Sequence, residues 1–196
     1  FFAIKGTKQN GNKFIKNAIK NGASTIVSNL KYQGFKNNIL FLKSQNPRAL
    51  LSEVSANIYS GKPKNIVAVT GTNGKSSIAN FFYQILNLQK KKVASIGTLG
   101  VSYQGSNTKT QNTSLDPISI NKLLQNLKNK NCNNVILEAS SHGLKQNRLD
   151  GLSFDIGIFT NLSHDHLDYH KSYKDYLSSK LYLFKNLIKN NGIIIV

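Results

Sequence analysis

A glycine-rich segment in the first half of the chain has the residue types of a phosphate-binding loop. The continuous apolar stretch 66–69 predicts a buried strand that runs into this segment, and a helix is expected over 75–89. Glycines let backbone N–H groups turn toward a phosphate, and the N-terminus of a helix adds partial positive charge. Lys75 would reach the β- and γ-phosphates, and the Ser76 hydroxyl would hold Mg²⁺. The predicted loop is Gly71, Thr72, Asn73, Gly74, Lys75, Ser76 and Ser77.

The loop is shorter than the common pattern GxxxxGK[ST]. That pattern would place its first glycine at position 69, where this chain has Val69. A glycine turn followed by a surface lysine is the alternative interpretation. The order strand, loop, helix favours the phosphate loop, because this order supplies both the turned N–H groups and the helix N-terminus.

A glutamate follows a second apolar strand about sixty residues after the loop. Glu138 comes directly after Val135, Ile136 and Leu137. In nucleotide-binding sheets, a carboxylate at such a strand end faces the phosphate site and can hold Mg²⁺, which prefers oxygen ligands. A solvent-exposed glutamate at a strand end fits the position equally well.

The four histidines all lie between positions 142 and 170, and three of them are in the segment 161–170. His164, His166 and His170, with Asp165 and Asp168, raise the possibility of a zinc site, but their spacing does not match a standard zinc motif. A merely polar loop is a further alternative. We favour a Mg²⁺-linked role beside the nucleotide, because the segment follows a strand of the same predicted sheet and strand ends converge on the ligand crevice.

Apolar periodicity predicts two units. In residues 1–62, strands are expected at 2–4, 25–27 and 39–42, with helices near 14–19 and from Pro47 to about 58. Leu50, Leu51, Val54 and Ile58 are expected to face inward. The segment 60–63 is the best candidate boundary. In residues 63–196, strands are expected at 66–69, 93–96, 134–137, 155–159 and 193–196, and the segment 98–103 is a candidate for a further strand. Helices are expected at 75–89, 117–128 and 173–187.

Composition limits the function classes. No apolar run is long enough to cross a membrane, so membrane insertion is not expected. Cys132 is the only cysteine, which excludes an internal disulfide and fits a reducing compartment such as the cytoplasm. The net charge of +18 invites a nucleic-acid interpretation, but the lysines are scattered and no nucleic-acid-binding motif accompanies them. The chain contains no methionine, and we expect it to be a fragment.

Three segments together resemble the Mur ligases. They are Gly71–Ser77, Leu137–Leu144 and Thr160–His170, and the stretches 2–7 and 11–15 also resemble that family's first domain. The resemblance covers nearly the whole chain. Within the family it is greatest to the MurE-type members, which add the third residue of the peptidoglycan stem peptide.

The resemblance implies roles for individual residues. The loop 71–77 would bind ATP together with Asn161, and Ser76 with Glu138 would hold one Mg²⁺. His166 and Lys180, the latter carbamylated, would hold a second Mg²⁺. Catalysis would depend on Lys75, His166 and Lys180. His164 replaces an arginine that is frequent at its position, and Leu115 replaces a usual proline. The residues that would contact the UDP-muramoyl peptide are Asn112, Thr113, Ser114, Ser140, Gln146 and Arg148.

The resemblance also implies a fold and a reaction. The fold would be α/β, with a small N-terminal α/β domain for UDP and a P-loop ATPase domain with a mostly parallel sheet, truncated at its end. The enzyme would be a monomer that joins meso-diaminopimelate or L-lysine to UDP-N-acetylmuramoyl-L-alanyl-D-glutamate through an acyl phosphate, and the 196-residue piece alone would ligate nothing. Another Mur or folylpolyglutamate-type ligase, or a basic nucleotide-dependent nucleic-acid-binding protein, remains an alternative.

Overall fold

The computed structural model describes residues 1–6, 9–109, 114–165 and 168–196, and contains two β-sheets. The smaller sheet has the order β1-β3-β2, with β1 (Thr25–Ser28) parallel and β2 (Gly34–Lys36) antiparallel to β3 (Ile39–Lys43). A 3₁₀ turn (Gly11–Phe14) and helix α1 (Ile15–Lys20) pack on it, with Ile15 and Ile26 in its core. The expected strand at 2–4 forms only an isolated bridge, from Phe2 to Val27.

The larger sheet has seven strands in the order β10-β9-β4-β8-β5-β6-β7. Five neighbours, from β10 to β5, are parallel, and the hairpin strands β6 and β7 extend the sheet in antiparallel fashion. The mostly parallel sheet predicted from the sequence is therefore confirmed. The strand bounds are β4 Asn65–Thr70, β5 Val93–Gly97, β6 Gly100–Tyr103, β7 Ser106–Thr108, β8 Asn134–Glu138, β9 Phe154–Phe159 and β10 Ile188–Ile195.

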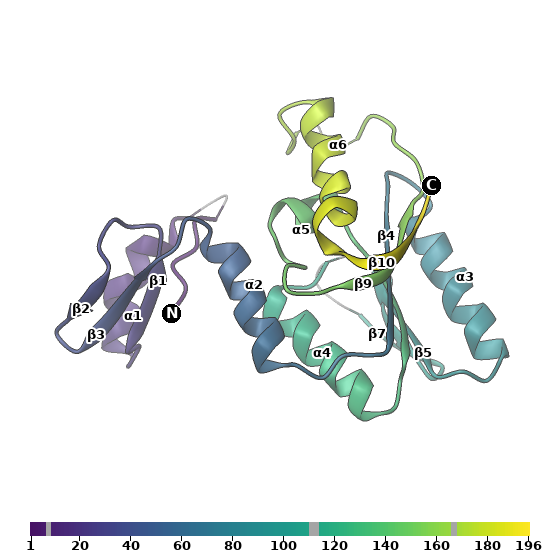
Figure 1. Cartoon of the computed structure of the whole chain (residues 1–196), viewed down its shortest axis with the longest axis horizontal. Coiled ribbons are helices and arrows are strands. Elements are labelled where there is room, and N and C mark those ends of the chain that lie inside the picture. Colours follow the sequence, from purple (N-terminus) through teal and green to yellow (C-terminus); the bar gives the residue numbers. More distant parts are fainter. Residues whose placement is uncertain (7–8, 110–113, 166–167) are drawn as a thin grey trace.

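Helices cover both faces of this sheet, as the ribbon in Figure 1 shows. Alternate residues of β4 point to opposite faces: Ile66 and Ala68 pack in one core, and Val67 and Val69 in the other. Helix α3 (Lys75–Leu88) covers the second face through Ile78, Ala79 and Phe82, and α4 (Pro117–Asn129) covers the first. Burial on both faces explains why β4 is apolar from Ile66 to Val69.

Two helices lie beyond the carboxyl ends of the parallel strands. Helix α5 (Ser141–Lys145) follows β8 directly, and α6 (Tyr173–Tyr182) continues into a π-helical turn over Leu183–Leu187. The expected helix 173–187 is thus present, but its last turn is wound differently. The short α5 was not expected, because five residues show no apolar period.

Helix α2 (Pro47–Ile58) connects the two sheets (Figure 1), and its buried face differs from our expectation. Ile58 is 67% exposed, whereas Ser52, Ser55 and Ala56 are buried. The serine hydroxyls donate to backbone carbonyls, so they are satisfied inside the protein. Small side chains also allow close packing, since a Cβ added at Gly151 would lie 2.8 Å from the Ala56 Cβ. In the part of the chain that the structure describes, no helix is long and apolar enough to span a bilayer.

Candidate nucleotide site

The predicted phosphate loop joins β4 to α3 in the expected way. Thr70 ends the strand and Lys75 begins the helix. Gly71 has a φ of +142° and Gly74 a φ of +82°, values that L side chains rarely adopt. A Cβ at Gly71 would also lie only 1.9 Å from the Thr160 Oγ1 atom. The loop therefore requires glycine at position 71 both for its backbone conformation and for the close approach of the segment after β9.

The Lys75 ammonium folds back over its own loop. Its Nζ donates to the Gly71 carbonyl at 3.0 Å and to the Thr72 carbonyl at 2.7 Å. Burial lowers the Lys75 pKa, and the nearby carboxylates of Glu138 and Asp165 partly oppose that shift. A cation that is half-buried over a turned backbone is placed to neutralise phosphate oxygens.

Glu138 is directed toward the loop and away from solvent. It is 3% exposed, and its Oε2 atom accepts from the Ser76 Oγ atom at 3.0 Å. Thr98 also binds this carboxylate. Its backbone N donates to the Glu138 Oε1 atom at 3.0 Å, and its hydroxyl donates to Oε2 at 3.1 Å. The interpretation of Glu138 as a solvent-exposed residue is therefore wrong. The Ser76 hydroxyl and the Glu138 carboxylate lie together as hard oxygen donors of the kind that Mg²⁺ prefers.

Gly97 offers a way to test the position of this carboxylate. A Cβ at Gly97 would lie 2.0 Å from the Glu138 Oε1 atom and 2.5 Å from its Cδ atom. We expect Gly97→Ala to displace the carboxylate from Ser76 and Thr98, at an overpacking cost of about 1–3 kcal/mol in the free energy of unfolding. Affinity for ATP with Mg²⁺, measured by calorimetry, should fall about tenfold, the size of one lost charged contact.

The matched control is Gly61→Ala, because Gly61 also lacks a positive φ, and the atoms nearest to an added Cβ there all belong to Gln125 of α4, the closest at 3.2 Å. This control should bind ATP and Mg²⁺ as the unchanged protein does. Equal affinities in the two variants would contradict the assignment of Glu138 to the cation.

The segment after β9 holds the other side of the loop. The backbone N of Asn73 donates to the Asn161 Oδ1 atom at 3.0 Å, and the Thr160 hydroxyl donates to the Asn73 carbonyl at 2.7 Å. The backbone N of Ser163 donates to the Thr72 hydroxyl at 3.0 Å. Asn161 thus lies beside the loop, and its role in binding ATP stays a prediction.

Lys180 lies next to the same loop, although it is 109 residues away from Gly71 in the sequence. It is 1% exposed, its Nζ donates to the Gly71 carbonyl at 2.6 Å, and it lies 4.3 Å from the centroid of the Tyr176 ring. Burial, followed by repulsion from Lys75, lowers the pKa of Lys180 to about 7. Near neutral pH much of this amine is therefore uncharged and nucleophilic.

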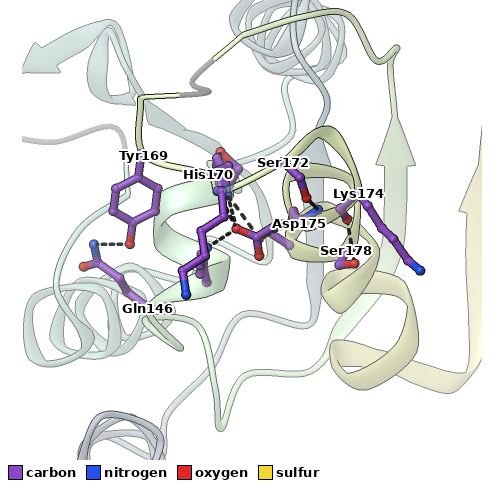
Figure 2. Close-up of polar contacts among 11 residues, drawn as sticks. Gln146, Tyr169, His170, Ser172, Lys174, Asp175 and Ser178 are labelled. Atoms are coloured by element: carbon purple, nitrogen blue, oxygen red, sulfur yellow. Dashed lines mark hydrogen bonds and ion pairs between the residues drawn. The ribbon is translucent and has the colours of Figure 1, made fainter.

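A polar network joins the start of α6 to α5, and Figure 2 shows it in close-up. His170 is fully buried, and its Nε2 atom lies 3.0 Å from the Ser141 hydroxyl. Asp175 forms an ion pair with Lys145 of α5 and accepts the backbone N–H of Lys171 at 3.1 Å. The network continues to the phosphate loop through Tyr176. The ring of Tyr176 packs against His170, and the Tyr176 hydroxyl lies 3.1 Å from the Thr72 hydroxyl. These contacts fix α6, and with it Lys180, over the loop.

The expected peptide-contacting residues form a second cluster. The Ser114 and Ser140 hydroxyls lie 2.9 Å apart, and Ser140 caps α5. Arg148 donates through Nη1 to the Ser114 carbonyl at 2.6 Å and through Nη2 to the Gln146 Oε1 atom at 2.9 Å. Gln146 in turn donates to the Tyr169 hydroxyl at 3.0 Å (Figure 2). Ser114 also donates to the Glu138 carbonyl at 3.3 Å, so this cluster adjoins the nucleotide site.

Three expected site residues lie outside the described residues: Asn112, Thr113 and His166. Among the residues that the structure describes, no three His, Cys, Asp or Glu side chains are grouped to hold a metal ion. Thr98, Thr160 and Tyr176 also belong to the site, although no sequence pattern pointed to them. They follow β5, follow β9 and lie within α6, respectively. Their proximity to the phosphate loop becomes evident only when the order of the strands in the sheet is known.

Comparison with known proteins identifies the family. A model described as the Mur ligase middle domain matches residues 69–196. The chain belongs to the Mur ligase family. The matched range includes the phosphate loop, Glu138, the segment after β9 and Lys180.

Two ligases from other organisms are similar to this chain in sequence. The chain is 42% identical over 200 residues to the UDP-N-acetylmuramoyl-L-alanyl-D-glutamate–2,6-diaminopimelate ligase of Rickettsia montanensis, a match that covers 100% of this chain and 41% of that protein. It is 40% identical over 188 residues to the ligase of the same name from a Chelativorans species, covering 96% of this chain and 39% of the relative. The chain thus spans about two fifths of the length of these relatives.

Solved structures agree with this assignment. A structure of a UDP-N-acetylmuramoyl-L-alanyl-D-glutamate–2,6-diaminopimelate ligase matches with a TM-score of 0.80 and 31% identity, over 96% of this chain and 39% of that one. The MurF ligase of Thermotoga maritima in complex with ADP matches with a TM-score of 0.60 and 22% identity, over 99% of this chain and 41% of that one. This second match supports the fold alone. The expected α/β fold of a Mur ligase is confirmed.

Proposed function

We propose that this chain is the nucleotide-binding part of a ligase that adds meso-diaminopimelate to UDP-N-acetylmuramoyl-L-alanyl-D-glutamate. The observation that carries the proposal is the convergence of Lys75, Ser76, Glu138 and Lys180 on one glycine loop. The relatives named as diaminopimelate ligases support this amino acid over L-lysine, which the sequence alone left open.

The geometry fits the activation of a carboxylate by ATP. The substrate carboxylate would attack the γ-phosphate, giving an acyl phosphate and ADP, and the amine would then displace phosphate to form the amide. Phosphoryl transfer depends mainly on positioning and charge neutralisation. Lys75 supplies one positive charge to the phosphates. Ser140, Gln146 and Arg148 would hold the muramoyl peptide beside them.

The donor set also fits magnesium. Ser76 and Glu138 would hold one Mg²⁺, and Lys180, once carbamylated, would hold a second together with His166. When bound, Mg²⁺ screens the negative charge of the phosphates. Glu138 is already held in place by Thr98, so its carboxylate needs little rearrangement to accept the ion.

We further propose that the enzyme acts as a monomer in the cytoplasm and does not use a polynucleotide. UDP-linked substrates and ATP are both polyanions, and a protein with a net charge of +18 attracts them without a nucleic-acid function.

The deciding experiment measures ADP release and amide formation by the complete gene product. The reaction contains UDP-N-acetylmuramoyl-L-alanyl-D-glutamate with meso-diaminopimelate, L-lysine or D-alanyl-D-alanine as the amine. We expect turnover with meso-diaminopimelate at least about a hundredfold above the other amines, and none without the UDP-linked substrate. Preference for another amine, or ATP hydrolysis that depends on DNA or RNA, would contradict the proposal.

A further inference from the structure

The only two arginines of the chain face one cavity. They are two of 26 basic residues, yet Arg48 on α2 and Arg148 after α5 both line a cavity of about 250 Å³. Its wall is completed by Ile4, Leu51, Gln146 and the start of α4 at Asp116 and Pro117. Two segments 100 residues apart in the sequence therefore bring guanidinium groups to the same space.

The two arginines differ in the number of hydrogen bonds that their guanidinium groups donate. Arg148 is oriented by Ser114 and Gln146, as described above, and belongs to the expected peptide-contacting set. Arg48 donates through Nη2 to the Lys5 carbonyl at 2.9 Å. Its remaining N–H groups have no hydrogen-bond acceptor among the described residues. Arg48 was not among the residues that the sequence assigned to any site.

The cavity has a net positive charge. Its one carboxylate, Asp116, caps α4 by accepting the backbone N–H groups of Ile118 and Ser119, each at 3.0 Å. Burial lowers the Arg148 pKa, and the proximity of Arg48 lowers it further, which is the expected effect of two like charges facing each other. An anion between the two guanidinium groups would relieve this repulsion and could accept hydrogen bonds from both.

We propose that Arg48 is a further substrate-binding residue, and that it grips an anionic group of the UDP-linked substrate jointly with Arg148. The group is either the diphosphate or a carboxylate of the glutamate. This inference rests on the proposed function, because that function supplies the substrate.

The test uses calorimetric binding to the 196-residue chain itself. The ligands are UDP-N-acetylmuramoyl-L-alanyl-D-glutamate, UDP and ATP with Mg²⁺. We expect Arg48→Gln to weaken binding of the muramoyl dipeptide about tenfold or more, and to leave ATP affinity unchanged. Lys43→Gln is the matched control, because Lys43 is an exposed lysine at the end of β3 that does not line the cavity, and its loss should change the affinity less than about twofold.

The two sources of the anion give different patterns. Weaker binding of UDP by Arg48→Gln would identify the diphosphate, whereas loss confined to the dipeptide would identify the glutamate carboxylate. Arg48→Lys keeps the charge without the planar fork and should bind at an intermediate strength. Thermal unfolding of each variant separates lost binding from lost folding, and Arg48→Lys decides the matter if Arg48→Gln does not fold.

Two results would overturn the inference. If Arg48→Gln or Arg48→Lys binds the dipeptide as well as the unchanged chain does, Arg48 only supports the Lys5 carbonyl, and the proposed function still stands. If the unchanged chain binds neither the dipeptide nor UDP, this inference fails, whereas the proposed function is decided separately by the ligation assay on the complete gene product.

Discussion

Replacing Lys180 by methionine is expected to lower ligation by the complete gene product at least about a hundredfold, since loss of a direct metal ligand should exceed the effect of its supporting residues. Lys180 is buried and its pKa is lowered to about 7, so its neutral amine can add carbon dioxide to give a carbamate and a proton. Methionine has a similar length but no amine. Because burial of an ammonium opposes folding, the free energy of unfolding of this variant should equal or exceed that of the unchanged protein.

The modification itself can be observed in the isolated chain. After incubation with ¹³C-labelled bicarbonate, the unchanged chain should show a carbamate resonance that Lys180→Met lacks. Lys174→Met is the control, since Lys174 is an exposed lysine of the same helix and its loss should leave both the resonance and ligation intact. A resonance that survives in Lys180→Met, or full ligation by that variant, would remove Lys180 from the site.

Replacing Lys75 by alanine is expected to weaken ATP binding at least about a hundredfold, or about 2.7 kcal/mol, because a half-buried cation over the phosphates would be lost. Calorimetry on the 196-residue chain measures this directly. Lys64→Ala is the matched control, because Lys64 is an exposed lysine just before the opposite end of β4.

Ser76→Ala should have a different signature from Lys75→Ala. Loss of the hydroxyl should weaken ATP binding about tenfold when Mg²⁺ is present and change it little when Mg²⁺ is absent, because the hydroxyl would be a ligand of the cation. Near-equal ATP affinity in Lys75→Ala and Lys64→Ala would show that the glycine loop does not bind phosphate.

Local signals predicted the phosphate loop and its strand and helix well. An apolar run, two glycines and a helical period within 25 residues are sufficient, because β4, the loop and α3 are contiguous in the chain. The position of Asp116 as the cap of α4 was also readable, since a capping side chain acts within three residues. The family resemblance favoured the Mg²⁺ role that the strand-end position of Glu138 had left open, and it alone pointed to Lys180. Both roles stay predictions.

Long-range packing was the part that the sequence could not supply. Glu138 was ambiguous until β5 placed Thr98 beside it, and the burial of Lys180 depends on α6 lying over Gly71. The expected inward face of α2 was wrong at Ile58 for a similar reason. In isolation, the serines of α2 are typical of a polar surface. In the fold, however, the Ser52 hydroxyl donates to the carbonyl of Asn147, which is 95 residues away in the sequence.

The attachment of α2 has a consequence for how the protein would flex. Ser52 donates to the Asn147 carbonyl, Ala56 packs on Gly151, and Gly61 contacts Gln125, so the helix and the segment after it are held on the central sheet's side. The predicted boundary after residue 62 stays a prediction, but α2 and residue 61 are anchored before it. Ser44 is bonded through its backbone N to the Ser28 carbonyl of the small sheet, and the Asn46 side chain is bonded to Asn147. Any swing of the small sheet would therefore bend the chain at Gln45 and would pull Lys5 away from Arg48.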